Sequence, residues 1–149
     1  MTAEEPEPQR HTGYLIRRAQ QVHVAAWARL VSTETSSVQY AIIATLDRLG
    51  PRSQRQLCDE IDLDRSTIAD LVTRMERRGL VRRDRDPADA RRKTVTLTPL
   101  GHREHERLRP LADEVEHALT DRLTTADRDV LRRTLRLLLE SAPDDSPAG

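Results

Sequence analysis

One short segment of the sequence alternates strictly between polar and apolar side chains. It runs from Thr94 to Thr98, and Pro99 follows directly. Such alternation is typical of a half-buried β-strand, and threonine followed by proline is a common helix start because threonine caps the first turn and proline fits within it. An earlier strand is expected from Leu80 to Arg83, with a densely charged turn between the two. The sequence therefore predicts a β-hairpin with a charged tip, followed at once by a helix.

Two short helices are predicted before the hairpin. Residues 53–56, Ser-Gln-Arg-Gln, have the form of a capping box that opens the first one. Asp64 can cap the second helix, and Gly79 can end it in the left-handed conformation. The predicted buried face of this second helix consists of Ile68, Leu71 or Val72, and Met75. The order of elements is therefore helix, tight turn, helix and hairpin.

Helices are also expected on both sides of this unit. Tyr14–Val31 contains no glycine or proline and carries apolar side chains on two faces, so this helix needs two neighbours. Another helix should begin near residues 35–37 and end at Gly50. A long helix should follow Pro99, with a kink at Pro110, and a last one should begin at a capping box at residues 124–127. The fold class is therefore mainly α with a small β-hairpin.

Composition limits how the chain can be organised. It has 149 residues, of which 34% are charged and 36% are apolar, so we expect one domain with little apolar material for a large isolated core. A core shared with a second chain would increase the apolar area that each chain can bury. The single cysteine excludes an internal disulfide, and the acidic, proline-rich N-terminus resembles neither a signal peptide nor an anchor. We therefore expect a cytoplasmic protein, with disordered tails at 1–11 and 142–149.

The charge is distributed unevenly along a chain whose formal net charge is +0. Residues 65–93 contain ten arginine or lysine residues and five acidic ones, giving +5, whereas residues 94–149 contain eight and eleven, giving −3. A basic segment of this kind is typical of a nucleic-acid contact. On a helix over 64–78, the side away from the predicted core carries Arg65, Ser66, Ala69, Asp70, Thr73, Arg74 and Arg77. A helix with such a face can enter the major groove of DNA end-on.

Individual side chains on this face suggest specific contacts. Arg65 and Arg74 can each make a bidentate contact with guanine, and Asp70 can either hold Arg74 at i,i+4 or accept from a cytosine amine. Three small hydroxyl side chains can approach phosphates or bases, namely Ser66, Thr67 and Thr73. An ordinary solvated helix face is the alternative, but the preceding helix and the following hairpin favour a groove-reading helix.

The hairpin tip carries three cations in succession, Arg91, Arg92 and Lys93. Next to a groove-reading helix, a tip of this kind can extend an arginine into the flanking minor groove, where the potential is most negative over narrow A·T tracts. Asp89 can brace Arg91 by a charge-assisted hydrogen bond. The alternative is a tip that serves only solubility.

Residues 64–101 resemble the recognition helix and wing of the MarR family of bacterial winged helix-turn-helix regulators. The family's wing has the form D-x-x-D-x-R, an alternating strand, and then L-T-x-x-G. In this sequence the pattern is filled by Asp86, Asp89, Arg91, Val95, Leu97, Thr98 and Gly101. The order of the helices extends the resemblance over 12–141.

The resemblance implies a single domain over 12–141, with dimerisation helices at 12–34 and 99–141 and a DNA-binding lobe at 35–98. It implies a homodimer that reads a near-palindromic operator and acts as a repressor that an effector releases. It places Arg91 in the minor groove and four residues toward the major groove, namely Ser66, Thr67, Thr73 and Arg74.

The resemblance also suggests a class of effector. Many members release DNA when a small aromatic molecule enters a cleft between the dimerisation helices and the DNA-binding lobe. The segment GYLIRRAQQ at 13–21 is similar to members that control the breakdown of hydroxycinnamates and related aromatic acids, some of which sense the coenzyme A thioester.

The first two helices carry side chains that suit an aromatic acid or its thioester. Ring-stacking candidates are Tyr14, His23, Trp27 and Tyr40. Arg17 or Arg18 can bind a carboxylate or phosphate. The alternative is that Trp27 and Tyr40 are dimer-core residues and that the two arginines are solvated.

The sequence offers less support for a reactive cysteine, a metal site or a catalytic site. Cys58 is expected to be a buried, unreactive thiol. His102, His105 and Glu106 could bind zinc, which keeps a metal-sensing regulator of the same family as an alternative, although no dense ligand cluster joins them in the sequence. No catalytic or nucleotide-binding motif occurs, so we expect neither an enzyme nor a cofactor. The rival from another class is a winged-helix protein-interaction module without an operator.

Overall fold

The computed structural model describes residues 6–140. The C-terminal tail expected at 142–149 and residues 1–5 of the N-terminal tail lie outside the described residues. The expectation of a disordered tail over 1–11 is wrong for residues 7–10, which form the 3-10 helix η1. In chain order the elements are η1 (Glu7–Arg10), α1 (Thr12–Leu30), α2 (Ser37–Leu49), β1 (Arg52–Ser53), α3 (Gln54–Ile61), α4 (Arg65–Arg77), β2 (Val81–Arg85), β3 (Lys93–Leu97), α5 (Pro99–Thr120) and α6 (Thr125–Glu140). The predicted fold class, mainly α with a small β wing, is confirmed.

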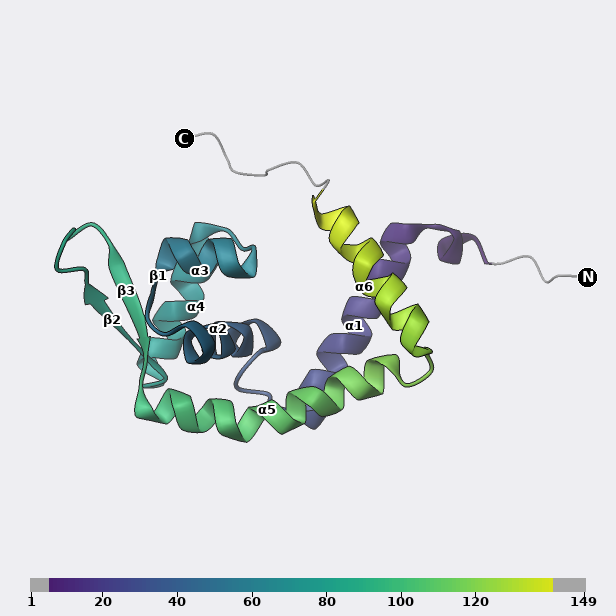
Figure 1. Cartoon of the computed structure of the whole chain (residues 1–149). Helices are drawn as coiled ribbons and strands as arrows, with labels where there is room; N and C mark the ends of the chain where they lie inside the picture. The colour runs from purple at the N-terminus through teal and green to yellow at the C-terminus, as the bar shows by residue number, and fades with distance from the viewer. Residues whose placement is uncertain (1–5, 141–149) are drawn as a thin grey trace, which may run out of the picture.

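The elements form two groups that α5 connects. In Figure 1, α2, α3, α4 and the sheet make one lobe, α1 and α6 lie on the other side of the molecule, and α5 runs beneath both groups. The lobe has its own apolar core, which consists of Ile42, Ile43, Leu46, Leu57, Ile68, Val72, Met75, Leu80, Val81, Val95 and Leu97. A second, smaller core joins α1 to α5 and consists of Ala26, Trp27, Val31, Leu108 and Val115.

The wing is a three-stranded antiparallel sheet with the strand order β1-β3-β2. The register pairs Val81 with Leu97 and Arg83 with Val95, which brings one face of the hairpin onto the lobe core. The hairpin was predicted from the alternation at 94–98. Strand β1 was not predicted, because two residues are too few to show a periodicity.

The caps predicted at the helix ends are present. Ser53 and Gln56 form the reciprocal capping box of α3. The side chain of Asp64 accepts a hydrogen bond at the start of α4, and Gly79 follows the helix with a φ of 74°. These local signals place α4 in the lobe, with Ile68, Val72 and Met75 buried and Leu71 half-buried.

The start of α5 is pressed against the end of the wing. Thr98 accepts the backbone N–H of Gly101 at 3.0 Å and donates to the carbonyl of Gly79 at 2.5 Å. A Cβ atom on Gly101 would lie 2.2 Å from the carbonyl oxygen of Leu80 and 2.6 Å from a methyl of Leu97. Glycine at this position therefore allows the close approach that joins the lobe to α5.

Helix α5 continues through Pro110 and changes direction along its length, as Figure 1 shows. Helix α6 has no buried residue. Large apolar side chains are exposed along it, namely Val130, Leu131, Leu135, Leu137, Leu138 and Leu139. Helix α1 exposes a similar set, namely Tyr14, Leu15, Ile16, Val22 and Val24. Within residues 6–140, no helix combines the length and apolar character that a membrane span requires.

Candidate functional site

The first turn of α4 is organised around the carboxylate of Asp64. This carboxylate accepts the backbone N–H of Thr67 at 3.1 Å and the hydroxyl protons of Ser66 and Thr67. These hydrogen bonds, first that of Ser66 and then that of Thr67, lower the pKa of Asp64 from 3.8 to about 2. Because both hydroxyl protons point to Asp64, Ser66 and Thr67 present lone pairs to the outside.

The rest of the outer face of α4 is exposed and cationic. Arg74 forms an ion pair with Asp70 at 3.0 Å, as expected for an i,i+4 pair. The carboxylate of Asp70 is therefore engaged by Arg74 and is not a free acceptor for a cytosine amine. Arg65 and Arg77 are also exposed. Thr73 is half-buried, and its hydroxyl donates to the carbonyl of Ala69 at 2.8 Å. The groups on this face that are free to donate are therefore mainly guanidinium groups.

The wing tip is a turn organised by two aspartates. Asp89 accepts the backbone N–H of Arg91 at 3.0 Å through Oδ1, and its carbonyl accepts that of Arg92 at 2.9 Å. Asp86 accepts the N–H of Ala88 through Oδ1 at 2.8 Å. The contact between Asp89 and Arg91 thus fixes the backbone and leaves the guanidinium exposed to solvent, like the side chains of Arg92 and Lys93.

A cationic cleft lies between the wing tip and the N-terminal ends of α3 and α4. Its volume is about 470 Å³, and its lining consists of Ser53, Gln54, Arg55, Cys58, Arg65, Asp89, Arg91, Arg92 and Lys93. Five of these side chains are cations and one is a carboxylate. Arg55 was not predicted, because the sequence of α3 shows a recognisable pattern only on its buried face.

Glu76 connects the recognition helix to the wing. Its carboxylate accepts the backbone N–H of Arg83 at 3.0 Å and a guanidinium N–H of the same residue at 3.2 Å. The hydrogen bonds from Arg83 lower the pKa of Glu76. A bidentate pair of this kind is directional, so α4 and β2 are held in one orientation relative to each other. This pair was not predicted, although both residues lie in the basic middle segment.

Three of the predicted effector residues lie in one row of rings. Trp27 is buried, and its ring centroid lies 6.3 Å from that of His23 and 5.5 Å from that of Tyr40. Tyr40 in turn stacks on His105 of α5, with 5.9 Å between the centroids. The other three predicted residues, Tyr14, Arg17 and Arg18, are exposed on the N-terminal half of α1 and are not part of this row.

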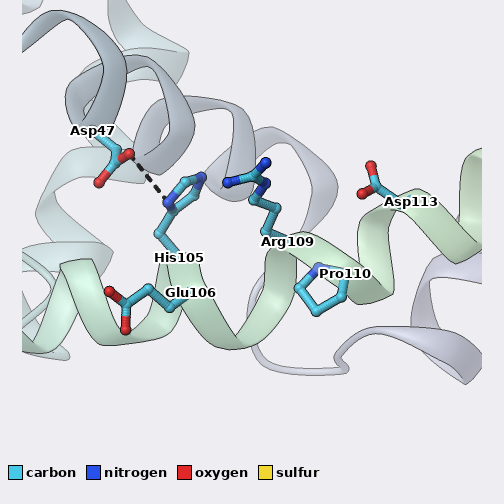
Figure 2. Close-up of a pocket in the computed structure, with 6 residues that line it drawn as sticks. All are labelled: Asp47, His105, Glu106, Arg109, Pro110 and Asp113. Atoms are coloured by element: carbon cyan, nitrogen blue, oxygen red, sulfur yellow. Dashed lines mark ion pairs between the residues drawn. The ribbon is translucent and has the colours of Figure 1, made fainter.

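A cleft between α2 and α5 lies at the end of the row. It has a volume of about 450 Å³ and is lined by Asp47, His105, Glu106, Arg109, Pro110 and Asp113, as Figure 2 shows. Burial raises the pKa of Tyr40, Asp113 raises it further, and Arg109 lowers it, so this hydroxyl lies within the electrostatic reach of the cleft. Sequence reasoning missed Asp47, Arg109 and Asp113, because the helices that carry them are far apart in the chain.

The structure also shows where the candidate zinc ligands and the single cysteine lie. Asp47 contacts the Nδ1 atoms of both His102 and His105, at 3.0 and 3.3 Å. Within residues 6–140, no group of three or more histidine, cysteine or acidic side chains is arranged to hold a metal ion. Cys58 is half-buried and lines the cationic cleft, so the expectation of a buried thiol is wrong in this respect. Burial is the main factor that raises the pKa of its thiol.

Comparisons with known proteins agree on one family. The model of the MarR family matches residues 35–93. The transcriptional regulator HosA of Escherichia coli O111:H- is 30% identical over 126 residues, which are 85% of this chain and 93% of HosA. These relationships cover the lobe and most of the helices around it.

Two solved structures extend the comparison to three dimensions. The crystal structure of the transcriptional regulator PcaV of Streptomyces coelicolor, in complex with its natural ligand, is 36% identical in sequence with a TM-score of 0.89; the match covers 96% of this chain and all of PcaV (100%). BpsR of Bordetella bronchiseptica, whose DNA binding is regulated by 6-hydroxynicotinic acid, is 29% identical with a TM-score of 0.77, covering 85% of this chain and 96% of BpsR. The chain belongs to the MarR family and is a transcriptional regulator.

Proposed function

We propose that the protein is a homodimeric repressor that binds a near-palindromic operator and releases it when an aromatic acid binds. The observation that carries the proposal is the cationic cleft between α3, α4 and the wing tip, because five cations face one carboxylate there. A cleft of this charge suits one phosphate backbone of a DNA duplex. The Glu76–Arg83 pair holds α4 and the wing, which lie on the two sides of this cleft, in a fixed relative orientation.

In this proposal α4 occupies the major groove and the wing tip follows the adjacent minor groove. Arg65, Arg74 and Arg77 supply donors toward base edges or phosphates, and Arg91 enters the minor groove. Because their hydroxyl protons are engaged by Asp64, Ser66 and Thr67 would act as acceptors for base amines. Further phosphate contacts are assigned to Arg55, Arg92 and Lys93.

A second copy of the chain would cover the apolar surfaces of α1 and α6. Helix α6 buries none of its own residues and yet exposes six large apolar side chains, while α1 exposes five. Apolar area of this extent is typical of an interface between subunits. We therefore assign residues 12–34 and 99–141 to dimerisation and 35–98 to DNA binding.

The α2–α5 cleft is the proposed effector site. It offers a guanidinium, Arg109, for the carboxylate of an aromatic acid, and the stacked rings of Tyr40 and His105 next to it. The regulation of BpsR by 6-hydroxynicotinic acid supports an effector of this class. Trp27, His23 and Tyr40 would sense the ligand through the ring row, and Tyr14, Arg17 and Arg18 are kept as contacts for a larger coenzyme A thioester only.

The proposal is tested by selecting bound sequences from a random DNA pool and then measuring affinity against salt. We expect an enriched near-palindromic sequence and a steep loss of affinity with ionic strength. Arg91→Ala should lower the magnitude of the salt slope by about one unit for each phosphate that the arginine neutralises. Arg103→Ala, which removes an exposed arginine from α5, is the matched control. A flat salt response with no enriched sequence would favour the protein-interaction module instead.

A further inference from the structure

The loop between α1 and α2 contains a polar residue that the structure buries completely. Thr35 has a relative exposure of 0% although it belongs to neither helix. Burying a hydroxyl and a loop carbonyl is costly unless both are hydrogen-bonded. The partners of this residue therefore show what the loop is held against.

The partners of Thr35 come from three different helices. Its carbonyl accepts the indole N–H of Trp27 on α1 at 2.7 Å. Its hydroxyl accepts a guanidinium N–H of Arg78 at 2.9 Å and donates to the carboxylate of Glu104 on α5 at 3.3 Å. Arg78 is the C-cap residue of α4, and its other terminal nitrogen donates to the carbonyl of Glu34 at 3.0 Å. We refer to Thr35, Arg78 and Glu104 as the polar junction.

The polar junction lies between two apolar cores that are separate. The core of the lobe contains the buried face of α4, and the smaller core joins α1 to α5. Apolar packing is not strongly directional, whereas hydrogen bonds to charged groups require a defined distance and angle. Tyr40 of α2 also packs against the smaller core, so the angle between the lobe and α5 is set by this apolar contact together with the more directional hydrogen bonds of the polar junction.

We propose that Arg78 is a positioning residue, which acts through the Thr35 hydroxyl and Glu104 to set the orientation of the recognition helix relative to α1 and α5. This inference rests on the proposed function, because the orientation matters for DNA only if two copies of α4 must reach two half-sites at a fixed spacing. Glu104 is suited to its part, since hydrogen bonds from Arg107, at 2.7 and 3.2 Å, keep its carboxylate charged and in place.

The same contacts give the effector cleft a route to α4. Trp27 belongs to the row of rings that ends at His105 in the cleft, and its indole also holds the carbonyl of Thr35. A ligand that moved these rings would therefore displace the loop between α1 and α2, to which Arg78 donates hydrogen bonds at Glu34 and Thr35.

The first test measures orientation without DNA. Spin labels at Glu60→Cys on α3 and His117→Cys on α5, in a Cys58→Ser background, report the distance between the lobe and α5. Labelled chains are diluted into unlabelled ones, so that only distances within a chain are recorded. We expect a narrow distribution in the parent protein, a broadened or shifted one in Thr35→Val, and recovery in Thr35→Ser, which keeps the hydroxyl.

A second variant guards against misfolding. Arg78→Lys keeps the charge, but a single ammonium group cannot reproduce the forked contacts to Thr35 and Glu34. Arg78→Lys should broaden the distribution of distances between the two spin labels, as Thr35→Val does. If Thr35→Val does not fold, Arg78→Lys decides the result. Parent-like distributions in folded Thr35→Val and Arg78→Lys would overturn the inference.

The second test uses the operator selected with the parent protein. Thr35→Val should lose about tenfold or more in affinity, because a buried hydrogen-bond partner is left unpaired in the bound orientation. The slope of its operator affinity against salt concentration should stay unchanged. Inserting one base pair between the half-sites should lower the affinity of Thr35→Val by a smaller factor than it lowers the affinity of the parent protein. If the parent selects no DNA but the distance distributions respond as expected, the proposed function fails while the positioning role stands. If the parent selects an operator but neither spacing nor distance responds, the positioning role alone fails.

Discussion

The carboxylate of Asp89 accepts the backbone N–H of Arg91 at 3.0 Å, so the wing tip is shaped by a side chain that does not itself carry the positive charge. Aspartate often stabilises a turn in this way, because its oxygen reaches the amide two residues along the chain. The guanidinium of Arg91 is left exposed to solvent. The direction of the tip therefore depends on Asp89, while its charge depends on Arg91 and its neighbours.

Replacing Asp89 separates these two roles. Asp89→Ala and Asp89→Asn remove the same negative charge, but asparagine keeps an oxygen that can accept the amide of Arg91. We expect Asp89→Asn to bind the selected operator several-fold more tightly than Asp89→Ala, with equal salt slopes and similar melting temperatures. Equal affinities of the two variants in a titration followed by anisotropy would show that the turn contact has no part in binding.

Asp64 should make the stability of α4 depend on acid. Its folded-state pKa is depressed from 3.8 to about 2, so the stabilisation is fully present above 3.8 and is lost as the pH falls through about 2. The difference in melting temperature between the parent protein and Asp64→Asn should therefore change across this window. Asparagine still caps the helix but does not titrate there. A constant difference from pH 5 to pH 2 would contradict the assignment.

Gly101→Ala should destabilise the protein. The new Cβ would lie 2.2 Å from the backbone oxygen of Leu80, and a backbone atom cannot rotate away as a side chain can. We expect a loss of about 1–3 kcal/mol in the free energy of unfolding, measured by urea denaturation. Gly13→Ala on α1 is the matched control, because no atom lies within 4 Å of the added methyl and alanine favours a helix. A neutral Gly101→Ala would mean that α5 can move away from the wing.

Leu135→Glu should weaken the dimer. Leu135 is 41% exposed in the single chain, on a helix without a buried residue, and a second copy would cover it. Burying the glutamate there would be costly. Sedimentation equilibrium should show a higher dissociation constant for the dimer, together with weaker operator binding. Arg133→Glu introduces the same side chain on the opposite face of α6 and should leave the dimer intact. Equal dissociation constants for both variants would argue against α6 as the interface.

The effector cleft is tested through the single tryptophan. We expect the emission of Trp27 to shift, and operator affinity to fall, when 6-hydroxynicotinic acid, 4-hydroxycinnamic acid or the coenzyme A thioester of the latter is added. Arg109→Ala should weaken the response to the free acids about tenfold or more, because it removes the partner of the carboxylate. Arg103→Ala controls for the loss of charge. If none of the three compounds changes emission or affinity, the effector assignment is wrong.

The sequence predicted the parts of the fold that depend on neighbouring residues. The capping box at Ser53, the cap at Asp64, the left-handed Gly79 and the Thr98-Pro99 start of α5 are all present. Each depends on contacts within a few residues, so a linear pattern contains the necessary information. The outward face of α4 followed from helical periodicity in the same way.

Contacts between distant segments were not predictable in this way. The meeting of Asp47 with His105, the tie between Glu76 and Arg83, and the place of Arg55 in the wing cleft appear only once the helices are packed. The proposed effector residues show the same limit. Trp27 and Tyr40 were identified by type, but the cleft beside Tyr40 is lined by His105 and by a cation, Arg109, which lies 69 residues after Tyr40 in the chain.

By itself, the sequence determined where the capped helices α3, α4 and α5 begin, where the hairpin of β2 and β3 lies, which face of α4 is buried and where the positive charge is concentrated. These properties follow from hydrogen bonds and periodicities a few residues long. Only the tertiary structure decided that Thr35 meets Arg78 and Glu104, and that the rings of α1 and α2 lead to a cleft on α5. The reason is geometric: such contacts exist only after apolar packing has brought separate helices to fixed distances, and no local pattern encodes those distances.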